Sequence, residues 1–107
     1  MVDYQVMDRE GEQASLILRG ELAGDISSQH LKGELERHYV DDGVREIRVD
    51  LGGLISITLE GVAILLELWQ ESERRGKRFA IHDATGQVRE VLLRTGVLPM
   101  LGDRSEA

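Results

Sequence analysis

Apolar and polar positions alternate in two segments of the chain, and this alternation is typical of half-buried β-strands. In the first, Ala14–Leu22, alanine and leucine side chains share one side of the extended chain. In the second, Val44–Leu51, isoleucine, valine and leucine alternate with charged residues. The shorter segments Tyr4–Met7 and Arg78–His82 predict two more strands.

Three other segments repeat apolar residues at spacings of three and four, which predicts amphipathic helices. The first covers Ser28–Tyr39 and the second about Leu59–Arg75. A third begins after Thr85 and ends at Gly96. Serine or threonine precedes each of these segments and offers an N-cap, with Thr58 as the cap of the second helix.

The predicted elements follow the order strand, strand, helix, strand, helix, strand, helix. Val97–Leu101 is expected to add a last short strand or turn, and residues 102–107 to fray. Strands that alternate with helices imply parallel, right-handed crossovers, with the first two strands forming an antiparallel edge. We therefore expect one α/β domain over residues 1–107, with a mixed sheet of four to five strands and three to four helices packed mainly on one face.

Composition narrows the possible functions. The chain has no cysteine, which excludes disulfides, thiolate metal sites and cysteine nucleophiles. Its formal net charge of −7 repels nucleic acid, and the basic cluster at residues 74–78 is interpreted as a solvated helix end. The longest nearly apolar stretch, Val62–Trp69, is too short to span a membrane, and the N-terminus lacks the pattern of a secretory signal. We expect a cytoplasmic protein with no nucleic-acid partner and no membrane insertion.

Catalytic and metal-binding patterns are missing from the sequence. His30 and His38 stand eight residues apart on one predicted helix and His82 on a strand, which does not suit a shared metal. The glycines form neither a G-x-G-x-x-G nor a Walker pattern. We therefore expect no catalytic residue, no metal, no cofactor and no enzymatic activity.

Three segments occur in an order that resembles a known family. Residues 18–22, LRGEL, are similar to an L-x-G-x-L-D motif. Residues 47–66 are similar to D-L-S-x-V-x-x-I-D-S-S-G-L-x-x-L, and residues 76–97 to a G-x-x-L strand followed by V-x-x-x-L-x-x-x-G-L. This arrangement, over about residues 15–101, resembles the STAS domain of bacterial anti-sigma-factor antagonists and of some transporter tails. The resemblance implies a single STAS-like domain.

The resemblance also implies a regulatory turn before the second predicted helix. In phosphorylated antagonists an Asp-Ser-Ser-Gly turn stands there, and a partner kinase modifies its first serine. This chain has Thr58, Leu59, Glu60 and Gly61 instead. Leu59, at the phosphosite position, has no hydroxyl, so the motif is degenerate and the usual serine phosphorylation is not expected. Ser56 and Thr58 remain alternative phosphoacceptors.

The other residues of this region have competing interpretations. Glu60 either imitates a phosphoserine and locks the domain in one signalling state, or stabilises the helix start by about 0.3–1 kcal/mol. Gly61 leaves room for a partner's backbone to approach, and Ala23 replaces the aspartate that follows the family's first motif. Leu54 and Leu59 flank the turn, and exposure of either would suit docking.

The function implied by the resemblance is non-enzymatic protein binding. The leading hypothesis is an antagonist-like regulator that docks a kinase-type anti-sigma factor of histidine-kinase fold. It would use the turn Thr58–Gly61, the helix that follows it and Ala23. One alternative is a STAS subunit that braces an ABC-transporter ATPase in phospholipid trafficking; another is a small-ligand or nucleotide sensor. Homodimerisation is a further expectation. Family members usually close with a helix after the last strand, and if such a helix is absent after Ala107, an apolar surface would be exposed.

Overall fold

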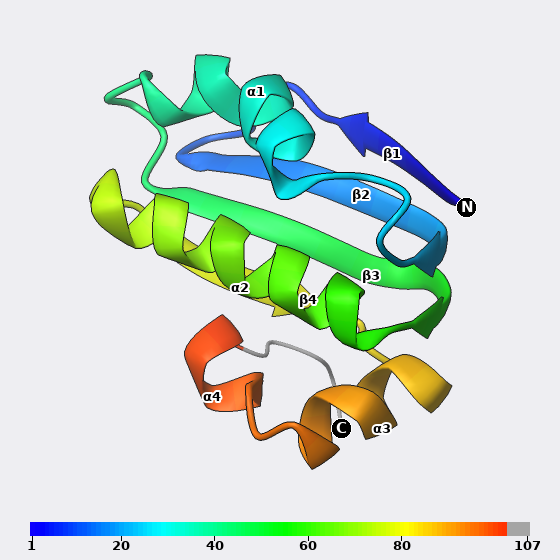
Figure 1. Cartoon of the computed structure of the whole chain (residues 1–107). Helices are drawn as coiled ribbons and strands as arrows, with labels where there is room; N and C mark the ends of the chain where they lie inside the picture. Colours follow the sequence, from blue (N-terminus) through cyan, green and yellow to red (C-terminus); the bar gives the residue numbers. More distant parts are fainter. Residues whose placement is uncertain (103–107) are drawn as a thin grey trace.

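Four strands and four helices make up the protein in a computed structural model, which describes residues 1–102 (Figure 1). In chain order the elements are β1 (Val2–Val6), β2 (Gln13–Leu22), α1 (Ser28–Tyr39), β3 (Glu46–Ile57), α2 (Leu59–Arg74), β4 (Arg78–His82), α3 (Gly86–Arg94) and α4 (Leu98–Leu101). None of the helices among the described residues has the length and apolar character needed to cross a membrane.

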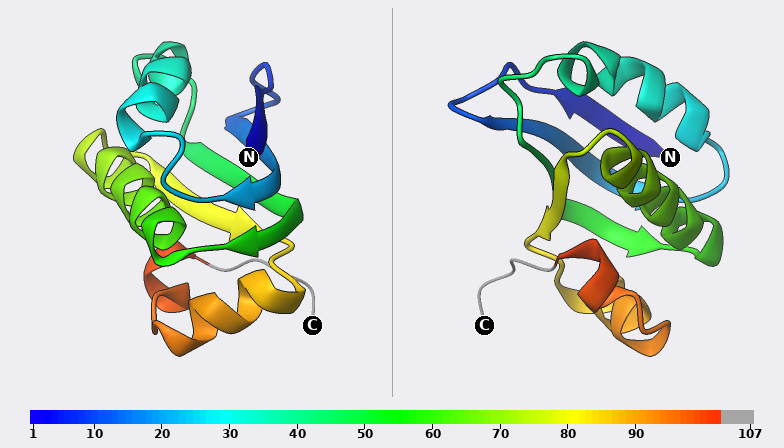
Figure 2. Two further views of the ribbon diagram at one scale, coloured as in Figure 1. Left: turned by 45° about the vertical axis from the view of Figure 1, so that its right-hand side comes forward. Right: turned by 90° about the vertical axis from the view of Figure 1, so that its left-hand side faces the viewer.

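The strands form one mixed sheet in the order β1-β2-β3-β4. β1 pairs with β2 antiparallel, whereas β2, β3 and β4 run parallel to one another. Helices α1 and α2 lie side by side over one face of this sheet, and α3 and α4 pack around its β4 end (Figure 2). The predicted α/β architecture with a mixed sheet is confirmed.

The core lies between the sheet and the two long helices. Parallel register places Leu16 beside Val49 and Val49 beside Ile81, so their side chains point to the same face, and all three are fully buried. Leu35 of α1 and Leu65 of α2 complete the core from the helix side and are also fully buried. The alternation in the sequence thus marks the face that the helices cover.

Strand β3 is longer than the predicted Val44–Leu51 and continues to Ile57. Its pairing with β2 contains two irregularities, because Ile17 pairs with Asp50 whereas Arg19 pairs with Gly53, and a second shift follows Gly20. Each inserts an extra residue into β3, which is the definition of a β-bulge. Gly52 and Gly53, which directly follow the predicted end of the strand at Leu51, therefore lie within a bulged strand.

Local start and stop signals place the helices as predicted. The Ser27 hydroxyl accepts a hydrogen bond from the His30 backbone N–H at 3.1 Å and caps α1. Thr85 occupies the N-cap of α3, although its side chain makes no capping hydrogen bond.

The expected strand or turn at residues 97–101 is wrong, because Leu98–Leu101 forms the short helix α4. Pro99 stands in its first turn, where a missing N–H is tolerated. Gly102 ends this helix in the left-handed conformation with φ of 62°. Residues 102–107 were expected to fray, and 103–107 of these lie outside the described residues.

Candidate functional site

The carboxyl ends of β2 and β3 lie at the same end of the sheet as the start of α2 (Figure 1). In open α/β sheets, ligands bind outside the carboxyl ends of the strands. We call the residues gathered here the tip surface: Glu21, Ala23, Asp25, Ile55, Ser56, Thr58, Leu59 and Glu60. It includes most of the residues that the sequence predicted for partner binding.

Thr58 fixes the start of α2 to the end of β2. Its backbone N–H donates to the carbonyl oxygen of Leu22 at 3.1 Å. Its side-chain oxygen Oγ1 accepts from the backbone N–H of Gly61 at 3.2 Å, so the predicted capping role is confirmed. The first turn of α2 is therefore held by one bond to the sheet and one bond to its own cap.

Gly61 is buried against the chain's own backbone. A Cβ at this position would lie 2.3 Å from the carbonyl oxygen of Leu22 and 2.7 Å from Cγ1 of Ile57. The close approach at this glycine is thus made by β2, and the missing side chain lets α2 pack on the sheet. Contact of Gly61 with a partner stays a prediction.

Leu59 and Ile55 expose large apolar side chains at the tip surface. Leu59 is 69% exposed and Ile55 74% exposed, whereas Leu54, the other leucine beside the turn, is only 5% exposed. Among residues 1–102 only Met1, at 87%, is a more exposed large apolar residue, and its carbonyl accepts from the N–H of Glu21. The most exposed apolar side chains of the described chain therefore gather at one end of the sheet.

Exposed acidic side chains lie in the same segments of the chain as these apolar residues. Glu60 is exposed in the first turn of α2, and a Cβ on Gly24 would lie 3.5 Å from its Cγ, so the loop after β2 packs beside it. Asp25 is exposed in the same loop, and Glu21 at the end of β2. Half-buried Ala23 precedes Gly24 and adds no charge of its own. The tip surface is thus both apolar and acidic.

The two candidate phosphoacceptors differ in their surroundings. The hydroxyl of half-buried Ser56 donates to Oε2 of Glu21 at 3.2 Å, so a phosphate on Ser56 would face a carboxylate. Thr58 is exposed at the N-cap of α2, where backbone N–H groups and the helix dipole favour an anion. Leu59, between these two positions and Gly61, is exposed.

Two histidines of α1, His30 and His38, contact the N-terminal segment of the chain. Tyr4 donates its hydroxyl proton to Oε1 of Glu34 at 2.7 Å, and this hydrogen bond, with some burial and the negative charge, raises the pKa of Tyr4. The Tyr4 oxygen also lies 2.6 Å from Nε2 of His30. His38 uses its Nε2 to contact the backbone oxygen of Met7 at 2.9 Å. Both histidines thus tie α1 to β1 and the residue after it.

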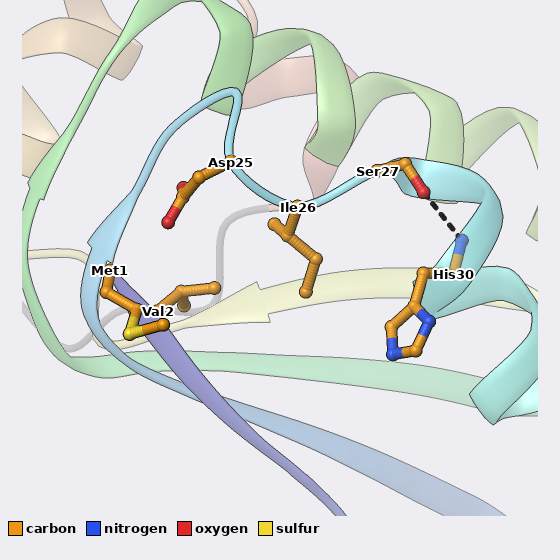
Figure 3. Close-up of a pocket in the computed structure, with 6 residues that line it drawn as sticks. All are labelled: Met1, Val2, Asp25, Ile26, Ser27 and His30. Atoms are coloured by element: carbon orange, nitrogen blue, oxygen red, sulfur yellow. Dashed lines mark hydrogen bonds between the residues drawn. The ribbon is translucent and has the colours of Figure 1, made fainter.

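A pocket of about 340 Å³ adjoins the tip surface (Figure 3). Its lining residues are Met1, Val2, Asp25, Ile26, Ser27 and His30. The imidazole of His30 is held by Tyr4, and Asp25 comes from the loop that precedes α1. Within residues 1–102, no group of three or more His, Cys, Asp or Glu side chains is arranged to hold a metal ion.

The sequence pointed to five residues of the tip surface, namely Ala23, Ser56, Thr58, Leu59 and Glu60. It gave no indication of Ile55 or of the acidic residues Glu21 and Asp25. Ile55 is the unpaired extra residue of the second bulge of β3, and its side chain is exposed. Glu21 joins the site because parallel pairing sets it beside Ser56. Neither feature has a local signal in the sequence, since both follow from strand register.

The chain has counterparts among known proteins. A family model described as "Mlab, STAS domain" matches residues 6–101. No curated protein matches the sequence.

Solved structures share the fold over nearly the whole chain. The anti-sigma factor antagonist SpoIIAA in its unphosphorylated form has a TM-score of 0.77 and 19% identity, covering 98% of this chain and 89% of its own. An anti-sigma factor antagonist from Mycobacterium paratuberculosis has a TM-score of 0.72 and 16% identity, covering 96% and 85%. The murine anion transporter Slc26a9 has a TM-score of 0.75 and 14% identity, covering 94% of this chain and 17% of the transporter.

Proposed function

Because the chain belongs to the STAS domain family, we propose that it is a non-enzymatic docking domain that binds another protein through the tip surface. The exposure of Leu59, in the first turn of α2, carries this proposal. Full burial of a leucine or isoleucine side chain is worth about 1.5–3 kcal/mol. Burial of Leu59 and Ile55 in an interface would therefore contribute favourably to the free energy of binding. Core packing does not require either side chain to be apolar.

The charge of the tip surface restricts the chemistry of the partner. Glu21, Asp25 and Glu60 expose carboxylates in the segments that also carry Leu59 and Ile55. Interfaces are arranged so that opposite potentials meet. The partner surface should therefore present apolar side chains with lysine or arginine around them.

A kinase-type anti-sigma factor of histidine-kinase fold is the leading partner. Two of the structures described above, which share this fold, are anti-sigma factor antagonists. In this chain Leu59 offers no hydroxyl at the phosphosite position, and Glu60 beside it carries a permanent negative charge. The domain would then stay in one docking state, with no resetting by phosphorylation at position 59.

A transporter ATPase is the second candidate partner, with the domain as a bracing subunit. The same fold occurs within the anion transporter Slc26a9. The missing hydroxyl at Leu59 favours this candidate too, because a partner without kinase activity needs no phosphoacceptor at the contact. The two candidates predict the same tip surface and differ in the identity of the bound protein.

The test begins with purification of the tagged chain from its native organism and identification of the bound protein. A histidine-kinase-fold protein supports the first candidate, and a transporter ATPase the second. Binding of the purified partner is then measured by calorimetry for Leu59→Asp and for Leu93→Asp. Leu93 is the matched control, because it is also exposed, at 58%, but lies on α3 away from the tip surface.

We expect Leu59→Asp to weaken binding at least about tenfold, as loss of a buried leucine does, and Leu93→Asp to bind as the wild type does. Equal affinities of Leu59→Asp and the wild type would refute docking through the tip surface. A melting temperature that rises with a nucleotide or other small ligand, with no protein bound, would instead support the sensor alternative.

A further inference from the structure

Strand β3 extends beyond the end of β4. The parallel pairing of these strands ends with Asp50 beside His82, whereas β3 continues to Ile57. Successive residues of a strand direct their backbone groups to opposite edges, and the N–H of Thr58 points toward β2. The N–H and C=O of Ile57 therefore point to the edge where β4 no longer offers a partner.

Gln87 of α3 occupies that place. Its Oε1 accepts from the backbone N–H of Ile57 at 2.9 Å, and its Nε2 donates to the carbonyl oxygen of Ile57 at 3.2 Å. A carboxamide has the donor and the acceptor of a peptide group, so it can pair with an extended residue as a neighbouring strand would. One side chain thus completes the sheet at the last residue of β3, and α3 packs against this strand.

We propose that Gln87 is a positioning residue for partner docking. Ile57 directly precedes Thr58, the cap of α2, and Leu59, the exposed apolar residue of the tip surface. Without the carboxamide, the backbone groups of Ile57 would exchange their partner for water, and the strand end would fray. A partner would then have to order the turn on binding, which lowers its affinity. This inference rests on the proposed docking function.

The position of α3 is thereby coupled to the tip surface. Gln87 is the second residue of α3, so any shift of this helix moves the carboxamide away from Ile57. No other side-chain hydrogen bond to the backbone of Ile57 is present among the described residues. The hydrogen-bonded part of this coupling therefore comes from one side chain, which can be replaced without changing a residue of the tip surface.

The experiment compares Gln87→Met and Gln87→Glu with the control Gln70→Met. Methionine matches the length of glutamine but cannot make either hydrogen bond, and a carboxylate at this position would face the carbonyl of Ile57. Gln70 is an exposed glutamine on α2 that makes no side-chain hydrogen bond in the described structure. Amide hydrogen exchange at Ile57 and affinity for the partner identified above are measured for each variant.

We expect exchange at Ile57 to accelerate and partner affinity to fall about tenfold in Gln87→Met, the effect of losing two partly solvated hydrogen bonds. Gln87→Glu should behave similarly at neutral pH, and Gln70→Met should match the wild type. Unchanged exchange at Ile57, or accelerated exchange with unchanged affinity, would overturn the positioning role. Failure of the docking function itself is recognised separately, because Leu59→Asp would then bind as well as the wild type.

Discussion

The carbonyl oxygen of Leu22 occupies the space beside Gly61 that a side chain would need, 2.3 Å from the ideal Cβ position. Gly61→Ala should therefore push the first turn of α2 away from β2 and strain the capping bond of Thr58. Overpacking of this kind lowers the free energy of unfolding by about 1–3 kcal/mol. Urea unfolding followed by circular dichroism measures the change.

Gly33 provides the matched control for that substitution. It is also a helical glycine, in α1, but nothing lies within 4 Å of its ideal Cβ position. Gly33→Ala should raise the free energy of unfolding by about 0.5–1 kcal/mol, because alanine favours the helix. Equal effects of the two substitutions would mean that contact with Leu22 does not determine the cost at Gly61.

Lys77 joins the end of α2 to the loop after α1. Its ammonium group donates to the carbonyl oxygens of Asp41 at 2.8 Å and Val44 at 2.7 Å, and the residue is only 8% exposed. Lys77→Met should lower the free energy of unfolding by about 2 kcal/mol, because both carbonyls lose a charged donor. The control Lys32→Met removes a lysine that makes no hydrogen bond or ion pair in the described structure, and should leave stability within about 0.5 kcal/mol of the wild type. Similar losses in both would argue against the carbonyl contacts.

Helices and their caps could be predicted from the sequence because their signals are local. The boundaries Ser28–Tyr39 agree with the predicted helix, and α2 ends one residue before the predicted end. Thr58 was identifiable as a cap because a threonine stands directly before an apolar repeat. The positions of Leu59 and Glu60 in the first turn follow from the same cap, so this part of the tip surface could be placed in advance.

Features that depend on tertiary pairing could not be predicted in this way. The predicted strand ends at Leu51, before Gly52 and Gly53. Pairing with β2 nevertheless continues beyond these glycines, with a bulge in β3. The same register decides that Leu54 is buried and Ile55 exposed, although both are apolar neighbours in the sequence. The roles of Gly61 and Gln87 depend on contacts with residues that are distant in the chain.

The pH dependence of stability should carry a contribution from Glu71. Burial favours the neutral form of this carboxyl, but hydrogen bonds from Arg75 and Arg74 outweigh it and lower the pKa of Glu71. A carboxyl with a lowered folded-state pKa stabilises the fold above the pKa of the unfolded chain, about 4.3, and loses that stabilisation as the pH falls.

Substitution isolates this contribution. Glu71→Gln should make the free energy of unfolding fall less steeply between about pH 5 and pH 3. Glu73→Gln, at an exposed neighbouring position of α2, is the control and should keep the wild-type slope. Urea unfolding at a series of pH values measures the slopes, and parallel curves for the wild type and Glu71→Gln would contradict the assigned cause.

Thr58 and Ser56 should respond differently to negative charge. Thr58→Ala removes the cap of α2 and should lower the free energy of unfolding by about 1 kcal/mol, whereas Thr58→Asp restores a capping oxygen and adds a charge that the helix start favours. Ser56→Asp instead sets a second carboxylate beside Glu21 and should destabilise the fold. Urea unfolding measures the free energy of unfolding of each variant, and we expect a higher value for Thr58→Asp than for Thr58→Ala. If Ser56→Asp proves at least as stable as Thr58→Asp, the electrostatic distinction between the two hydroxyls is wrong.

If Thr58→Asp proves the more stable variant, Thr58 is the hydroxyl at which the fold accepts a phosphate. Mass spectrometry after incubation with a kinase-type partner should then find any phosphate on Thr58 and none on Ser56.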